Sequence, residues 1–222
     1  MTRFDLVIFD LDGTLADTKR DLADATNHTL AELKLPTHSS EKVASFVGGG
    51  LNLLLQRALS TAGADADDAA LLEKARSIFV PWYRDHMLDA TRPYPGTEEM
   101  IARLAGAGVR MAIATNKPRI FTAGIVDTLF PRRFTPVVAC GDDAPRKPDP
   151  TCVDLCRKAH PDVPTERILF VGDSLVDIDT ARNARVAVAS CSWGFGEREA
   201  LAERKPEILV DVMPELAKAV VP

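Results

Sequence analysis

The sequence has no long hydrophobic run and no excess of positive charge. Its 222 residues carry a formal net charge of -5, whereas a protein whose main partner is nucleic acid normally has a basic face. No apolar stretch approaches the roughly 20 residues that a membrane helix needs. The chain begins at once with Phe4–Asp10, without the basic start and apolar run of a signal peptide. We therefore expect a cytoplasmic protein, monomeric or homodimeric, with no nucleic-acid or membrane partner.

Cysteine is scarce, and its spacing excludes the common metal motifs. The four cysteines form no C-x-x-C pair and have no zinc spacing with the four histidines. Cys152 and Cys156 share an apolar helical stripe with Leu155 and Ala159. We predict that both are buried, reduced thiols, which pack as small hydrophobic groups. Internal repeats and low-complexity tracts are also lacking.

Short apolar runs recur along the chain, and helical patterns separate them. The runs are continuous rather than alternating, as in strands that helices cover on both faces of a sheet. The expected strands are residues 6–9, 109–114, 136–140, 168–171, 186–190 and 208–210. Alternating strands and helices indicate a mainly parallel sheet. The predicted fold class is therefore α/β, with a Rossmann-like parallel sheet.

Residues 16–89 interrupt this alternation. They contain no convincing strand and several strong helical patterns, of which the clearest begin near Leu51 and Leu71. Three carboxylates, Asp65, Asp67 and Asp68, precede the second of these helices, and we expect them to cap its positive end. We predict an α-helical cap subdomain of residues 16–89, inserted into a core of residues 1–15 and 90–222.

Polar side chains follow the predicted strands where each strand ends. They are Asp10, Asp12, Gly13 and Thr14 after the first run, Thr115, Asn116 and Lys117 at the end of the second, Lys147 in the loop before the fourth, and Asp173 and Asp177 after the fourth. Ligands bind beyond the carboxyl ends of parallel strands, so we expect these side chains to converge. Several carboxylates at one edge repel each other unless a cation lies among them.

The oxygen-rich set favours a hard metal ion. Without nearby histidine or cysteine, Mg²⁺ is the expected cofactor where phosphate shares the site, and Mn²⁺ is able to replace it. The candidate metal ligands are Asp10, Asp12, Asp173 and Asp177. For Asp10 and Asp12 to serve one substrate, the chain must curl at 11–13, which Gly13 allows.

The same residues supply the groups for hydrolysis of a small phosphate monoester. Asp10 is the candidate nucleophile, which forms an acyl phosphate, and Asp12 the candidate general acid and base. Thr115 and Lys147 are further catalytic candidates, and the phosphate-binding candidates are Gly13, Thr14, Thr115, Asn116 and Lys147. In the helical insert, Gly49 lies before the helix that begins near Leu51 and is a candidate for binding a substrate carboxylate through backbone N–H groups. The alternative for Gly48–Gly50 is a plain turn between helices.

These residues resemble the four motifs of the haloacid dehalogenase superfamily. Asp10-Leu-Asp-Gly-Thr-Leu15 resembles the first motif and Thr115 the second. Lys147, in Arg-Lys-Pro-Asp-Pro, is similar to the third, and Gly172-Asp-Ser-x-x-Asp177 to the fourth. The resemblance covers nearly the whole chain. It implies that the helical insert is the cap that family members carry between the first two motifs.

Softer similarities point to the phosphoglycolate phosphatase branch of that superfamily. They lie at Phe46–Leu51, Ala114–Pro118, Gly141–Asp143 and Trp193–Gly196. There are two departures: Arg185 stands where the branch usually has glycine, and the loop from Asp143 to Lys147 is short.

The branch implies hydrolysis of 2-phosphoglycolate to glycolate and phosphate. Asp12 favours ester chemistry, because dehalogenases of the superfamily lack this second acid. The alternatives are a pyrophosphatase, a sugar-phosphate phosphatase, a β-phosphoglucomutase or a non-catalytic binding protein.

Overall fold

The computed structural model describes residues 2–222, which form two compact units. One unit contains residues 2–17 and 93–222, and the other is Thr18–Arg92. The predicted insert, residues 16–89, begins two residues earlier and ends three residues earlier than this second unit. Its role as a cap stays a prediction.

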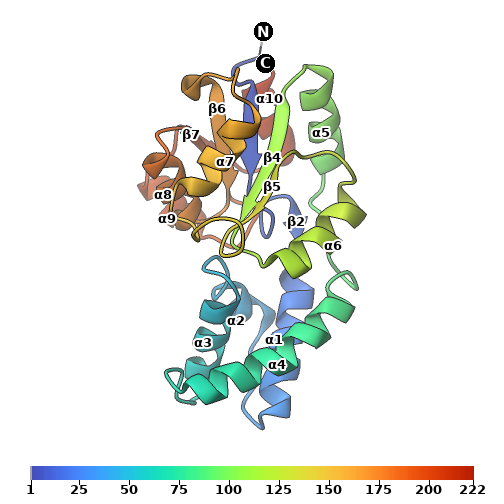
Figure 1. Ribbon diagram of the computed structural model, residues 1–222, viewed down its shortest axis with the longest axis vertical. Coiled ribbons are helices and arrows are strands. Elements are labelled where there is room, and N and C mark those ends of the chain that lie inside the picture. The colour runs from blue at the N-terminus through green and yellow to red at the C-terminus, as the bar shows by residue number, and fades with distance from the viewer. Residues whose placement is uncertain (1) are drawn as a thin grey trace. The chain divides into compact units, whose positions relative to one another are not determined.

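The first unit is built on a six-stranded sheet with the order β5-β4-β1-β6-β7-β8. Figure 1 labels β4, β5, β6 and β7 of this sheet. Every neighbouring pair of strands runs parallel. The strands are β1 (Leu6–Phe9), β4 (Arg110–Thr115), β5 (Val137–Ala139), β6 (Ile168–Gly172), β7 (Ala187–Cys191) and β8 (Ile208–Val210). The predicted α/β fold with a parallel sheet is confirmed. The central strand β1 lies between β4 and β6, which follow it by about a hundred residues or more.

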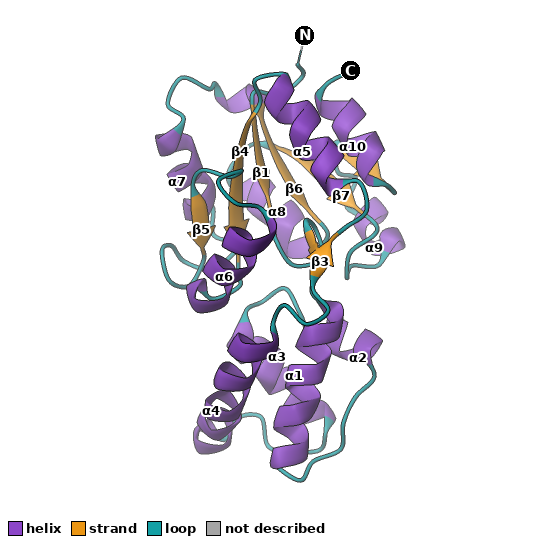
Figure 2. Cartoon of the chain, turned by 90° about the vertical axis from the view of Figure 1, so that its right-hand side faces the viewer, coloured by secondary structure: helices purple, strands orange, loops and turns teal. Residues whose placement is uncertain are grey.

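Helices cover both faces of this sheet, which explains the unbroken apolar runs. The helices of the unit are α5 (Thr97–Gly106), α6 (Arg119–Leu129), α7 (Thr151–Ala159), α8 (Leu175–Asn183), α9 (Arg198–Glu203) and α10 (Met213–Val220). One face of the sheet, with Leu6 and Ile8 of β1, packs on α7 and α8 in a single buried cluster. On the other side α5 contacts α10, as Figure 2 shows. All four cysteines are buried and free, as predicted for Cys152 and Cys156.

The second unit is a bundle of the helices α1 (Lys19–Glu32), α2 (Ser40–Ala44), α3 (Leu51–Thr61) and α4 (Ala69–His86). Helix α1 contacts each of the other three. The predicted stripe of α3, from Leu51 to Leu59, is buried, as are Ala75 and Phe79 of α4. Within residues 2–222, no helix is both long enough and apolar enough to cross a bilayer.

The N-terminus of α4 is capped by a carboxylate. Asp68 caps α4, because its carboxylate accepts hydrogen bonds from the N–H groups of Ala70 and Leu71 at 2.8 and 3.2 Å. The expected capping carboxylate is thereby confirmed at Asp68.

The prediction of no strand from residue 16 onward was wrong at its first residues: β2 (Ala16–Asp17) pairs with β3 (Arg92–Pro93). Strands of two residues are too short to show a hydrophobic period.

A buried carboxylate joins the two ends of the helical unit, and its loss should destabilise the protein. Asp21 of α1 accepts hydrogen bonds from the Thr91 N–H and hydroxyl at 2.8 and 2.7 Å, and from the Ala90 N–H. We expect Asp21→Ala to lower the free energy of unfolding by about 2–3 kcal/mol, because buried donors of Thr91 lose their acceptor. Urea denaturation measures this change.

Asp24→Ala, on the same helix, is the matched control. Asp24 forms only an exposed ion pair with Arg20, and such pairs contribute about 0–1 kcal/mol. Equal effects of the two substitutions would contradict the assigned role of Asp21.

Candidate active site

The carboxyl ends of three neighbouring strands bring the predicted residues to one edge of the sheet. Asp10 follows the last residue of β1, Thr115 is the last residue of β4, and Asp173 follows the last residue of β6. Both β4 and β6 pair with β1 in parallel register. Residues more than a hundred positions apart are therefore neighbours here, as expected from strand order alone.

The chain curls directly after β1, at the point predicted. Leu11 O accepts hydrogen bonds from the N–H groups of Leu15 and Ala16, and Gly13 has a φ of +82°. A Cβ at Gly13 would lie 2.3 Å from Oδ2 of Asp173, so glycine is required by both conformation and space. The curl places Thr14 so that its hydroxyl donates to Oδ1 of Asp173 at 2.9 Å.

Three buried carboxylates meet at this edge. Asp10, Asp173 and Asp177 each offer an oxygen, and these oxygens all lie within 4.8 Å of one another. Among residues 2–222 they are the one such group of acidic, histidine and cysteine side chains. An all-oxygen set of this kind fits a hard divalent cation such as Mg²⁺. Asp12, also predicted as a ligand, has its carboxylate outside this group.

The crowding raises the pKa of two of these carboxyl groups. The pKa of Asp173 is raised to about 8, first by burial and then by the charges of Asp177 and Asp10, while hydrogen bonds from Phe195 and Thr14 oppose the rise. Burial also raises the pKa of Asp10 to about 6, although Lys147 opposes the rise. Each carboxylate is therefore poorly stabilised as an anion until a cation compensates it.

Lys147 is the cation within this cluster. Its ammonium lies 2.7 Å from Asp177 and 3.0 Å from Asp10, and all three side chains are buried. Burial alone would lower the pKa of Lys147, but the charges of Asp10 and Asp177 raise it above its usual value. Lys147 is thus a charged site residue and not a solvated surface lysine. The loop from Asp143, short as it is, allows this contact.

The main chain of Lys147 is held by Asn116. The Asn116 side-chain oxygen accepts the Lys147 N–H at 2.8 Å, and its amide donates to the Lys147 carbonyl at 3.2 Å. Asn116 therefore links the end of β4 to the loop that carries the lysine. The prediction that Asn116 binds phosphate is not tested by this contact.

Lys117, given no role from the sequence, is a second buried cation of the site. Its ammonium donates to both carboxylate oxygens of Asp12, at 3.0 and 3.1 Å. The hydroxyl of Thr115 accepts the Lys117 N–H at 3.2 Å, and the residue that caps α6 is Pro118, not Thr115. The sequence signal for Lys117 was its place at a strand end, beside Thr115.

The six charged side chains carry a net charge of -2. Four carboxylates, at Asp10, Asp12, Asp173 and Asp177, oppose the ammonium groups of Lys117 and Lys147. With all six ionised, four negative and two positive charges leave two negative charges uncompensated. One divalent cation neutralises this remainder, which fits the oxygen cluster.

The loop after β7, residues 193–196, encloses Asp173. The sequence had given this loop no role in the site. The Phe195 N–H donates to Oδ2 of Asp173 at 2.7 Å, and the Trp193 indole donates to the Thr14 carbonyl at 3.1 Å. A Cβ at Gly194 would lie 2.3 Å from the Asp173 side chain, and one at Gly196 would lie 2.1 Å from its carbonyl oxygen. The two glycines after β7 therefore allow the close approach of this loop.

Asp177 is fixed at the first turn of α8. Its Oδ2 accepts hydrogen bonds from the Ser174 N–H at 3.0 Å and the Ser174 hydroxyl at 2.6 Å, in a capping box. At the other end of this helix, Arg185 has a φ of +58°. Glycine adopts this left-handed conformation more readily than other residues and is common there after a helix. Arg185, which stands where the branch usually has glycine, therefore occupies a position that favours glycine.

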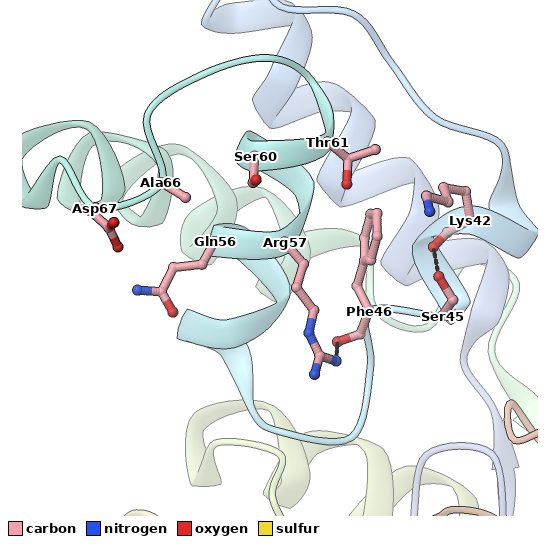
Figure 3. A pocket seen from close by; sticks show the side chains of 9 residues that line it. All are labelled: Lys42, Ser45, Phe46, Gln56, Arg57, Ser60, Thr61, Ala66 and Asp67. Atoms are coloured by element: carbon pink, nitrogen blue, oxygen red, sulfur yellow. Dashed lines mark hydrogen bonds between the residues drawn. The ribbon is translucent and has the colours of Figure 1, made fainter.

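Gly49 belongs to the helical unit and lies two residues before the start of α3. Gly50, with a φ of +86°, precedes α3, and the Arg57 guanidinium donates to the Phe46 carbonyl at 3.1 Å. Figure 3 shows this contact in a surface hollow of about 490 Å³. This hydrogen bond connects Arg57 of α3 to the segment that leads to Gly48–Gly50. The prediction that Gly49 binds substrate is not tested.

Comparison with known proteins agrees with this site. The family model for haloacid dehalogenase-like hydrolases matches residues 7–191. The chain belongs to this family. The match contains Asp10, Thr115, Lys147 and Asp173, so the resemblance recognised in the sequence is confirmed, and with it the expectation of a hydrolase.

Relatives of this haloacid dehalogenase-like hydrolase include curated phosphoglycolate phosphatases. One from Pseudomonas syringae pv. tomato is 38% identical over 95% of this chain and 78% of its own length. One from Agrobacterium fabrum is 36% identical over 96% of this chain and 91% of its own. The crystal structure of a predicted phosphoglycolate phosphatase from Haemophilus somnus superimposes with a TM-score of 0.90 at 29% identity, over 98% of both chains.

The raised pKa of Asp173 predicts how Mg²⁺ should affect stability at different pH values. An aspartate in the unfolded chain has a pKa of about 3.9, so between about pH 4 and pH 8 the metal-free native protein holds a proton that the unfolded chain has lost. The contribution of Asp173 to stability is therefore present below pH 4 and is lost as the pH rises through about 8. Mg²⁺ binds the deprotonated form. We expect Mg²⁺ to raise the melting temperature more at pH 8.5 than at pH 6.

Differential scanning fluorimetry with and without Mg²⁺ measures this difference. In Asp173→Asn, which cannot ionise at this position, the stabilisation by Mg²⁺ should be small and nearly independent of pH. An equal Mg²⁺ shift at both pH values in the wild type would contradict the expectation.

Proposed function

We propose that this protein is a Mg²⁺-dependent phosphatase that hydrolyses 2-phosphoglycolate to glycolate and phosphate through an aspartyl-phosphate at Asp10. The observation that carries the proposal is the buried cluster of Asp10, Asp173 and Asp177, in which the Lys147 ammonium contacts Asp10 and Asp177. A second acid, Asp12, follows the nucleophile by two residues. The substrate is inferred from the curated phosphoglycolate phosphatases among the relatives.

The first step is assigned to Asp10 and Asp12. The Asp10 carboxylate attacks phosphorus, a phosphorus–oxygen bond forms, and the bond to the ester oxygen breaks. Protonated Asp12 gives its proton to the departing alkoxide, which leaves as an alcohol. The ammonium of Lys147, 3.0 Å from Asp10, stabilises negative charge on the phosphoryl oxygens.

The second step regenerates the protein. The Asp12 carboxylate takes a proton from water, whose oxygen attacks phosphorus while the bond to Asp10 breaks. Inorganic phosphate leaves, and Asp12 is again protonated. Asp10, Asp173 and Asp177 would hold Mg²⁺, which supplies charge stabilisation to the phosphoryl group when bound. We retain Asp12 for proton transfer rather than as a carboxylate ligand, because its carboxylate contacts Lys117.

The remaining site residues are assigned to binding. The backbone around Gly13, together with Thr14 and Thr115, is at the edge where phosphoryl oxygens would bind. The helical unit Thr18–Arg92 is assigned to substrate selection, with Gly49 as its candidate for the carboxylate of the substrate.

The proposal is tested by phosphate release from 2-phosphoglycolate, with and without Mg²⁺. We expect Mg²⁺-dependent release that falls by more than about 10³-fold in Asp10→Asn, because the nucleophile is lost. Asp154→Asn, at an exposed acidic position on α7, is the matched control and should retain wild-type activity. A panel with pyrophosphate and sugar phosphates tests the substrate. Preference for another phosphorylated compound would refute the assignment of 2-phosphoglycolate but not the aspartyl-phosphate mechanism. An active Asp10→Asn variant would refute the aspartyl-phosphate.

The role of Asp12 is tested separately. We expect Asp12→Ala to lower kcat by about 10²–10⁴-fold, the usual contribution of general acid–base catalysis. The Mg²⁺ concentration for half-maximal activity should change little, because the Asp12 carboxylate lies outside the oxygen cluster. Steady-state kinetics at varied Mg²⁺ measures both quantities, and a parallel loss of kcat and Mg²⁺ affinity would instead make Asp12 a metal ligand.

A further inference from the structure

Lys117 is a buried lysine with an unusual two-point contact. Only 3% of its side chain is exposed, against 11% for Asp12, and its ammonium contacts both oxygens of that carboxylate. Lysine is almost never fully buried unless it is paired. The contact joins residues 105 positions apart, one after β1 and one after β4. The Asp12 carboxylate therefore offsets the charge of this buried ammonium.

The backbone of Lys117 is fixed on both sides. Its N–H donates to the Thr115 hydroxyl, and its carbonyl accepts the Thr122 hydroxyl of α6 at 3.0 Å. Pro118 then begins the approach to α6. The lysine thus extends from a rigid strand–helix junction, which is the support that a side chain needs to hold another group in place.

Asp12 needs such support, as the other carboxylates of the site do. The terminal torsion of an aspartate is broad and does not by itself fix the plane of the carboxylate. Lys147 contacts Asp10 and Asp177, and Asp177 also accepts a hydrogen bond from Ser174. Asp173 accepts hydrogen bonds from Thr14 and Phe195. Contacts from one ammonium to both oxygens define the plane of the Asp12 carboxylate in the same way.

We propose that Lys117 is a positioning residue that orients Asp12 for proton transfer to and from the substrate. The inference rests on the proposed phosphatase function, in which Asp12 is the acid and base. During the reaction one Asp12 oxygen moves from the ammonium to the ester oxygen or to water, while the other keeps its contact with Lys117. A misplacement of about 1 Å in such a group is able to lower the rate by about 10²-fold.

The two buried lysines therefore have different tasks. Lys147 contacts Asp10 and Asp177, the nucleophile and a member of the oxygen cluster. Lys117 contacts Asp12. Loss of Lys117 should impair the proton-transfer steps and leave the metal site intact.

The experiment compares two esters that differ in their need for an acid. The alkoxide of 2-phosphoglycolate must be protonated as it leaves, whereas p-nitrophenolate is a stable anion. For Lys117→Met we expect kcat on 2-phosphoglycolate to fall about 10²-fold, with KM and the half-maximal Mg²⁺ concentration within about 3-fold of wild type. With p-nitrophenyl phosphate we expect a burst of p-nitrophenolate followed by slow turnover, because water activation by Asp12 is still impaired.

A double substitution separates positioning from direct contact with phosphate. If Lys117 acts only through Asp12, Lys117→Met should lose nothing further in an Asp12→Asn background. Lys158→Met, at an exposed position on α7, is the matched control and should behave as wild type. Melting temperatures monitor folding, and Lys117→Gln, which keeps a hydrogen-bond donor, takes the place of Lys117→Met if the latter does not fold.

Three results would overturn the inference. They are equal losses on both esters without a burst, a fall in Mg²⁺ affinity in step with kcat, and a further loss in the double variant. Unchanged kinetics of Lys117→Met would overturn it as well. A wild-type protein that hydrolyses neither ester would instead refute the proposed function, so the two failures are distinguishable.

Discussion

Repulsion among buried carboxylates is the constraint from which the rest of the site follows. Three of these groups are buried with oxygens within 4.8 Å of one another, and both burial and this short distance disfavour their charged forms. The protein compensates with the Lys147 ammonium and with donors from Thr14, Phe195 and Ser174. Glycines occur where those donors must come close. The conformation at Gly13 and the packing at Gly194 are both consequences of placing Asp173 between two loops.

Strand order turns this local constraint into a property of the whole core. Because β1 lies between β4 and β6, the nucleophile candidate shares an edge with the ends of both neighbours. Asn116 then connects β4 to the loop that carries Lys147. The charged groups are therefore held by the sheet itself, which gives a rigid site at the carboxyl ends of the strands.

The sequence predicted the parts of this arrangement that depend on short-range pattern. Strands buried on both faces are continuous apolar runs, so their ends located Asp10, Thr115 and Asp173. Lys117 could not be assigned in this way, because a lysine before a helix is usually solvated and the Asp12 carboxylate that offsets its charge lies 105 positions away. The contact of Asn116 with the Lys147 backbone is equally non-local. Gly49 lies in the helical unit, where no strand end marks a site.

The charge balance explains why the site needs two lysines and a divalent cation together. Four carboxylates and two ammonium groups leave a net charge of -2, which a bound divalent cation brings to zero. A phosphate monoester, itself a dianion near neutral pH, then enters a site without net negative charge, and protonation of Asp12 for the first step removes one more negative charge. Within this balance, Lys147 offsets charge in the oxygen cluster and Lys117 offsets the charge of Asp12. Each lysine also orients the carboxylate that it contacts, so charge neutralisation and geometry depend on the same ion pairs.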